Sequence, residues 1–101
     1  MSPEEIAAKI SQRRRQVLVH SIIYYRFDEN IVPDHKWMQW AQELVALQQE
    51  HPALAAQCPL AKEFEGWTGE SGFQLPMTDP YWVGLAQWLL DYHNQHHRRN
   101  E

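Results

Sequence analysis

Two histidines near the end of the chain have a spacing that can bind a metal. His93 and His97 are four positions apart, so in a helix their imidazoles share one face and can hold a transition metal. Asp91 is the nearest additional donor, but no Cys, Asp or Glu stands at a third helical spacing beside them. A solvated helix end is the better interpretation, and we predict no metal site.

Cys58 and His51 have the side chains of a thiol nucleophile and its base. Such a pair needs a third group that orients the base, and the sequence places none beside them. Cys58 is also the only cysteine, so an intrachain disulfide is impossible and secretion is not indicated. We predict no catalytic residue.

Phosphate and nucleic-acid sites have little support in the sequence. Gly69 and Gly72 precede no helix of the phosphate-binding kind. Three consecutive arginines, Arg13 to Arg15, would point around most of a helix, which favours a solvated surface. The formal net charge of -4 gives no general attraction to nucleic acid or to an anionic membrane, so neither is an expected partner.

Start and stop signals predict a long first helix from about residue 3 to 27. Ser2 can cap it, Pro3 suits its first position, and Glu5 completes a capping box. Apolar residues recur on one face at helical spacing, and the interior arginines are expected to face water. Asp28 to Asn30 and then Val32-Pro33 end the helix.

A second helix is predicted from a cap at Asp34 to about residue 49. Its large side chains have the three/four spacing of one buried face, and His51-Pro52 ends it. The face consists of Trp37, Trp40, Ala41, Leu44 and Leu47. Two antiparallel helices joined by a short loop form an αα-hairpin.

The rest of the chain is predicted to be a loop-rich connector followed by one helix. Residues 52–57 and 59–64 each allow a helical turn or two, and the glycines near 66–76 also allow a small β-hairpin. Thr78-Asp79-Pro80 starts a last helix that runs to about 97. The prediction is a mainly all-α fold in one domain, residues 1–101, with a helical hairpin (1–57), a connector (58–78) and a C-terminal helix (79–97).

The stretch from Tyr24 to Leu54 has a pattern found in a known family. It contains, in order, Tyr24-Tyr25, Pro33-Asp34, Trp37-Met38, Leu44, Leu47 and His51-Pro52-Ala53-Leu54. This pattern resembles the small N-terminal helical domain, called Ia, of bacterial NAD-dependent DNA ligases. The resemblance covers roughly residues 15–60.

The resemblance implies a binding site for the nicotinamide mononucleotide half of NAD. In that family the domain closes over this half of the cofactor, and a flat nicotinamide ring can be sandwiched by aromatic side chains. The resemblance implies that Tyr24 and Trp37 stack on the ring and that Tyr25 and Asp34 make polar contacts. NAD or nicotinamide mononucleotide is the expected ligand, and no other cofactor is predicted.

The chain departs from the family pattern in two places that bear on function. Met38 stands where the family has an Asp, so one polar contact to the ligand is lost. The three lysines, Lys9, Lys36 and Lys62, lie in no Lys-x-Asp-Gly nucleophile motif. The chain is therefore expected to be a noncatalytic binding module that binds the nucleotide or docks on a separate partner, rather than an enzyme.

The same residues allow an alternative from another class. Tyr24, Trp37 and Trp40 can be core aromatics, with Asp34 a simple cap. The protein would then be an interaction or accessory factor of a mobile element or phage, and exposed aromatics would bind a partner protein. Those aromatics would be Trp67, Phe73, Trp82 and Trp88.

Two further expectations complete the sequence-based prediction. NAD hydrolysis would need a carboxylate beside the ribose, and Asp34 is the candidate for that role. The first residues do not form a signal peptide, and no apolar run approaches the roughly 18 residues of a membrane span. We expect a cytoplasmic protein. An open cleft at Tyr24 and Trp37 would favour nucleotide binding, and burial of both rings would favour the interaction protein.

Overall fold

The computed structural model describes residues 1–72 and 75–98, with side chains described up to residue 96. These residues form four helices: α1 (Pro3–Phe27), α2 (Asp34–Glu50), α3 (Pro52–Gln57) and α4 (Pro80–Arg98). None of the described residues forms a strand, so the predicted mainly all-α fold is confirmed. None of the described helices combines the length and the apolar character that crossing a lipid bilayer requires.

Helix α1 begins and ends where its signals predicted. The backbone N–H of Glu5 donates to Ser2 Oγ at 3.2 Å, and the Glu5 carboxylate accepts from the Ser2 backbone N–H at 3.5 Å, which completes the capping box. At the other end Asp28 adopts a left-handed conformation, with φ 52°, and its backbone N–H donates to the Ile23 carbonyl. This left-handed residue stops the helix and turns the chain toward α2.

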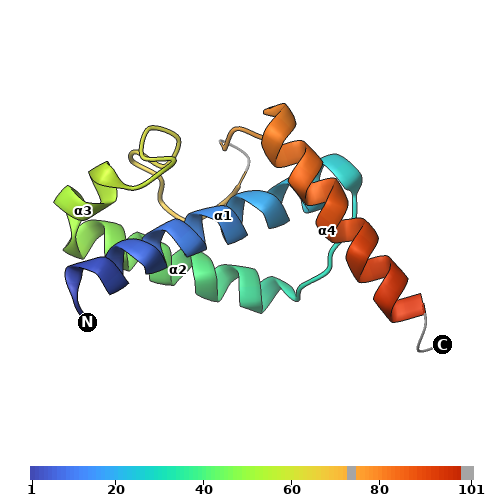
Figure 1. The fold of residues 1–101 in the computed structure, drawn as a ribbon, viewed down its shortest axis with the longest axis horizontal. Helices are drawn as coiled ribbons and strands as arrows, with labels where there is room; N and C mark the ends of the chain where they lie inside the picture. Colours follow the sequence, from blue (N-terminus) through green and yellow to red (C-terminus); the bar gives the residue numbers. More distant parts are fainter. Residues whose placement is uncertain (73–74, 99–101) are drawn as a thin grey trace.

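Helices α1 and α2 form the predicted hairpin, and α3 continues from its far end (Figure 1). The core lies along their shared face, where Leu18, Ile22 and Leu44 are completely buried. Arg13 and Lys9 pair with Glu43 across the outer edge of the same interface. Apolar burial therefore holds the two helices together, with ion pairs adding little at the surface.

The predicted cap of α2 is wrong by one residue. Pro33 occupies the cap position with an extended backbone, and Asp34 is the first residue of the helix, with no side-chain cap. The Asp34 carboxylate instead accepts a 3.4 Å hydrogen bond from the Asn30 amide. Proline's fixed φ suits the extended conformation before a helix, and a carboxylate in the first turn is favoured by the helix dipole.

Arg14 corrects the prediction that all three arginines face water. Its side chain is only 2% exposed. The guanidinium donates to Gln48 and to the backbone carbonyls of Ala55, Cys58 and Pro59, at 2.9 to 3.3 Å. Burial lowers the pKa of Arg14 from its usual value. Arg14 therefore ties α1 to the residues that end α3.

The connector between α3 and α4 also differs from expectation. Its described residues form turns and bends, so the β-hairpin allowed near 66–76 is not present among them, and residues 73–74, including Phe73, lie outside the described part. Trp67 is buried against Phe64, with ring centroids 5.1 Å apart. The prediction that Trp67 is exposed was wrong, because the turns fold this ring back onto the hairpin.

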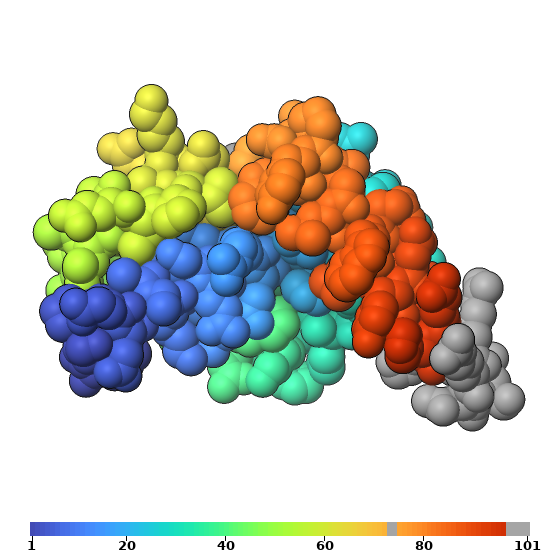
Figure 2. Space-filling model, viewed as in Figure 1, coloured from blue at the N-terminus to red at the C-terminus, as the bar shows by residue number. Residues whose placement is uncertain are grey.

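Helix α4 starts at the predicted signal, with Asp79 Oδ1 accepting from the backbone N–H of Tyr81 at 3.0 Å. It packs on α1 through Ala86 and Leu90, and among the described helices α1 is its one neighbour. In Figure 2, α4, coloured orange to red, covers the right-hand part of the visible face. Its opposite side faces solvent, with Trp88 60% exposed, whereas Trp82 is half-buried.

Candidate functional site

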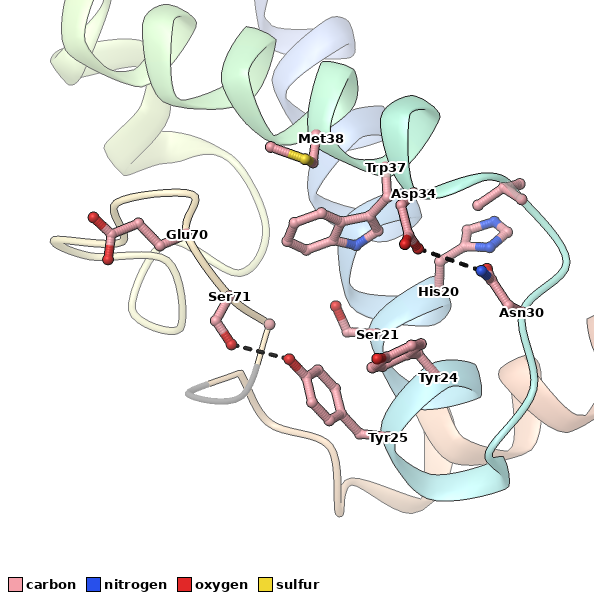
Figure 3. A pocket seen from close by; sticks show the side chains of 12 residues that line it. His20, Ser21, Tyr24, Tyr25, Asn30, Asp34, Trp37, Met38, Glu70 and Ser71 are labelled. Carbon is pink, nitrogen blue, oxygen red and sulfur yellow. Dashed lines mark hydrogen bonds between the residues drawn. The ribbon is translucent and has the colours of Figure 1, made fainter.

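An open pocket of about 230 Å³ lies where α1 ends and α2 begins. Figure 3 shows its side chains coming from three segments: the end of α1, the start of α2 with the loop before it, and the connector. The lining residues are His20, Ser21, Tyr24, Tyr25, Asn30, Val32, Asp34, Trp37, Met38, Glu70, Ser71 and Gly72. All four residues that the sequence nominated for a site, Tyr24, Tyr25, Asp34 and Trp37, are among them.

The aromatic side chains form two sides of the pocket. Tyr24 is 54% and Tyr25 43% exposed, and their rings meet edge to face at 4.9 Å. Trp37 lies across from them, partly buried, and its indole N–H donates to the Val17 carbonyl at 3.4 Å. The edge contact between Trp37 and Trp67, at 6.2 Å, supports the indole from behind. Trp37 is therefore a fixed surface against which a flat ligand can stack.

This arrangement favours the binding interpretation over the one in which these aromatics are core residues. Trp40, the third aromatic of the core alternative, is buried, but Tyr24 and Trp37 border an open pocket. An open cleft at these two rings was the outcome expected of a binding site. Met38, which replaces the Asp of the ligase Ia pattern, is about half exposed and lines the same pocket with an apolar thioether.

His20 belongs to the pocket, although the sequence did not nominate it. Its ring packs at a tilt on Trp40, with centroids 5.2 Å apart. Burial, with a smaller contribution from His93, lowers the pKa of His20 to about 4. The imidazole is therefore neutral at neutral pH, so one ring nitrogen can donate and the other can accept. Its position one helical turn before Tyr24 was the signal that could have found it.

Residues of the connector form the third side of the pocket, and sequence patterns did not predict this contribution. The Tyr25 hydroxyl and Ser71 Oγ are hydrogen-bonded at 3.0 Å, and the Trp67 indole N–H donates to the Ser71 carbonyl at 2.8 Å. Gly72 packs so tightly on α1 that a Cβ there would lie 2.6 Å from the Ser21 Cβ. These contacts hold residues 70–72, here called the connector wall, against the end of α1.

The other chemical groups considered from the sequence lie away from this pocket. Cys58 is buried, and its thiol donates to the Ala7 carbonyl at 3.6 Å. The His51 Nε2 lies 3.9 Å from the Glu50 carboxylate. Among residues with described side chains, no group of three or more His, Cys, Asp or Glu could hold a metal ion; the His97 side chain lies outside that set.

Comparison with known proteins identifies the class to which this fold and pocket belong. Residues 3–58 match the family described as "DNA ligase-like, N-terminal NAD+-binding domain". Because the match spans more than half of the chain, the chain belongs to this family. It covers α1, α2 and α3, and with them every pocket residue except those of the connector wall.

Individual relatives are bacterial DNA ligases. The chain is 37% identical to the DNA ligase of Bacillus subtilis over 54 residues, which is 54% of this chain and 8% of the ligase. It is 31% identical to the DNA ligase of Pseudomonas paraeruginosa over 90 residues, 85% of this chain and 11% of the ligase. The chain thus spans about a tenth of these relatives' length. No solved structure matches it.

Proposed function

We propose that this chain is a noncatalytic binding module that recognises NAD+ or nicotinamide mononucleotide in the pocket between α1 and α2. The observation that carries the proposal is the convergence of Tyr24, Tyr25, Asp34 and Trp37 on one open pocket. The family match supports it, since that family is described as NAD+-binding. We further propose that residues 1–101 act as a single module.

The side chains suggest a division of roles. The nicotinamide ring stacks between Trp37, which is fixed by its indole hydrogen bond, and the exposed ring of Tyr24. The Asp34 carboxylate accepts from the ligand's amide or ribose hydroxyls, and the Tyr25 hydroxyl adds a polar contact. Two stacking surfaces with a few polar groups are typical of small-ligand sites.

The module contributes binding rather than chemistry. The 101 residues contain no Lys-x-Asp-Gly motif, so nucleotidyl transfer to this chain's own lysines is not part of the proposal. Any transfer would use a nucleophile outside these residues, on a partner against which the module docks. Asp34, the candidate for NAD hydrolysis, is assigned here to binding.

Calorimetry with NAD+ and with nicotinamide mononucleotide tests the proposal. We expect micromolar binding, weakened at least tenfold by Trp37→Ala through loss of the stacking surface, an effect of about 1.4 kcal/mol or more. Asp34→Ala should weaken binding about threefold to tenfold through loss of a polar contact. Trp88→Ala, on the solvent face of α4, is the matched control and should leave the affinity unchanged. Absence of binding to the folded wild-type protein would refute the proposal.

A second candidate, a protein-interaction module, is favoured by the solvent face of α4. Tyr81, Leu85, Trp88 and Tyr92 are exposed at helical spacing, and the Trp88 and Tyr92 rings stack at 5.5 Å. Contiguous exposed aromatics are typical of partner surfaces. Crosslinking in cells should identify a partner that is lost in Trp88→Ser but retained in Trp37→Ala. Loss in both variants, or in neither, would speak against this surface.

A further inference from the structure

A second, larger pocket lies between the end of α2, helix α3 and the connector, and Arg14 of α1 forms part of its lining. Its volume is about 590 Å³, which is within the range of small-molecule sites. In Figure 1, α3 lies at the end of the hairpin away from α4. None of the described residues that line this second pocket, here called the Arg14 pocket, also lines the pocket between α1 and α2. A ligand in the Arg14 pocket would therefore occupy a separate site.

Arg14 uses most of its donors to hold the chain together, but one nitrogen of its guanidinium has none of these partners. Nε donates to Gln48, and Nη1 is shared among three backbone carbonyls, at 2.9 to 3.3 Å. Nη2 donates to no acceptor in the part of the chain that the structure describes. No enclosed side-chain nitrogen or oxygen in that part lacks a hydrogen-bond partner, so Nη2 must reach accessible space. Because Arg14 lines the pocket, the N–H groups of Nη2 are available to a ligand there.

The buried charge of Arg14 also lacks an ion-pair partner. Carbonyl and amide oxygens solvate a guanidinium, but a buried charge is usually paired with an opposite charge as well. None of the ion pairs between described residues includes Arg14. Burial lowers the pKa of Arg14, and the smaller opposing effects of Cys58 and Glu63 do not restore it. An anion in the pocket would supply the missing counter-charge.

The rest of the lining suits an anion of low charge with an apolar body. Lys62 and Glu65 both line the pocket from exposed positions and have opposite charges, so the buried guanidinium sets the sign of the net charge. Two buried aromatic rings of the lining, Phe64 and Trp67, meet edge to face at 5.1 Å. The central guanidinium carbon of Arg14 lies 5.8 Å from the centre of the Phe64 ring. The positive group thus stands beside an apolar wall.

We propose that the Arg14 pocket binds a small organic carboxylate with an apolar or aromatic body, and that Nη2 of Arg14 donates to the carboxylate oxygen. A guanidinium binds such oxygens through charge-assisted hydrogen bonds, and the exposed Lys62 adds a second, weaker attraction. A carboxylate carries one negative charge, which the pocket can balance, whereas the second charge of a phosphate ester would be repelled by Glu65. The site adds a ligand class to the module and does not depend on nucleotide binding.

A titration followed by nuclear magnetic resonance tests the proposal on the full chain, with benzoate and benzamide as probes. The two molecules have the same shape and differ in charge. At constant ionic strength, we expect benzoate to shift the Nε–H signal of Arg14 and to bind with a millimolar Kd, about fivefold or more tighter than benzamide. Phenyl phosphate should bind more weakly than benzoate, because Glu65 repels its additional charge.

Substitutions at the exposed lining residues should change benzoate binding in opposite directions without affecting the fold. Lys62→Gln should weaken it about twofold, and Glu65→Gln should strengthen it by a similar factor, as expected for partly screened charges. Lys36→Gln makes the same change at an exposed residue outside the pocket and is the matched control. Arg14→Met, studied where its spectrum shows a folded protein, should abolish the preference for benzoate over benzamide.

Several outcomes would overturn the proposal. Equal binding of benzoate and benzamide would refute an anion site, and so would a benzoate affinity that neither Lys62→Gln nor Glu65→Gln changes. Tighter binding of phenyl phosphate than of benzoate would overturn the assignment to carboxylates. Because no nicotinamide nucleotide takes part in these titrations, their results are independent of whether the proposed function is correct.

Discussion

The two ends of the α1–α2 hairpin use polar side chains in opposite ways. At the end near α3, Arg14 is buried and donates to Gln48 and three backbone carbonyls. At the other end, Tyr24 and Tyr25 are about half exposed around an open pocket. The first end holds the chain together, and the second leaves groups available to a ligand. One helix thus carries a stabilising site and a candidate binding site about three turns apart.

The largest effect that would test this contrast comes from Arg14→Met. Methionine retains most of the bulk but leaves the Gln48 amide oxygen and three carbonyls without their donor, so we expect a loss of about 3 kcal/mol in the free energy of unfolding. Urea denaturation measures it. Arg15→Met makes the same change on the exposed neighbour and should cost no more than about 0.5 kcal/mol. The comparison fails if the two variants are equally stable, or if Arg14→Met abolishes nucleotide binding while the protein stays folded.

A smaller effect is expected from Gly72→Ala at the pocket end. The added methyl group would overlap Ser21 and push the connector wall away from α1. We expect a loss of about 2 kcal/mol in stability and several-fold weaker binding of NAD+ than in the wild type. Thermal unfolding and calorimetry would measure these changes.

Gly84→Ala provides the matched control for that substitution. A Cβ at Gly84 meets open space, and alanine is the better helix former. The free energy of unfolding of this variant should therefore rise by roughly 0.5–1 kcal/mol. Equal effects of the two substitutions would show that the contact between Gly72 and Ser21 does not fix the wall.

The smallest effect concerns pH and His20. Because burial lowers the pKa of folded His20 to about 4, the unfolded chain, with an ordinary value near 6.5, binds the proton more readily. Stability from the neutral ring is therefore present above a pH of about 6.5 and is lost as the pH falls toward 4. Protonation linked to His20 is expected to lower the free energy of unfolding by about 1.5 kcal/mol between a pH of about 6.5 and about 5.

His20→Phe should flatten that part of the stability profile, because phenylalanine cannot be protonated and can pack on Trp40. Denaturation at several pH values would measure the slopes. His35→Phe removes an exposed histidine and should retain the wild-type slope. If His20→Phe loses as much stability in acid as the wild-type protein, groups other than His20 cause the loss.

Local signals predicted most of the fold. The bounds of α1 and α3 agree with the capping box at Ser2 and the proline at position 52, since caps and prolines act on the residues beside them. Asp34 shows the limit of such signals, because Pro33 and Asp34 both suit a helix start and the sequence does not decide between them. Tyr24 and Trp37 were grouped through the resemblance to the ligase Ia domain, and the structure shows that both line one pocket where α1 ends and α2 begins.

The contacts that were missed join residues far apart in the chain. Arg14 meets its three carbonyls 41 to 45 positions later, and Tyr25 meets Ser71 46 positions later. Helical spacing carries no information at those separations. An arginine among arginines is normally solvated, and Glu70 to Gly72 have ordinary turn chemistry, so neither stood out before the chain was folded.

The attachment of α4 has a consequence for the order in which the molecule opens. Because α1 is its one neighbour among the described helices, α4 can detach in a partial unfolding event that breaks a single interface, whereas α1 is released only when the whole hairpin comes apart. Native-state amide exchange should therefore be faster along α4 than at the centre of α1. Such an opening also separates His93 from His20, whose pKa is lowered mainly by burial and to a smaller extent by His93.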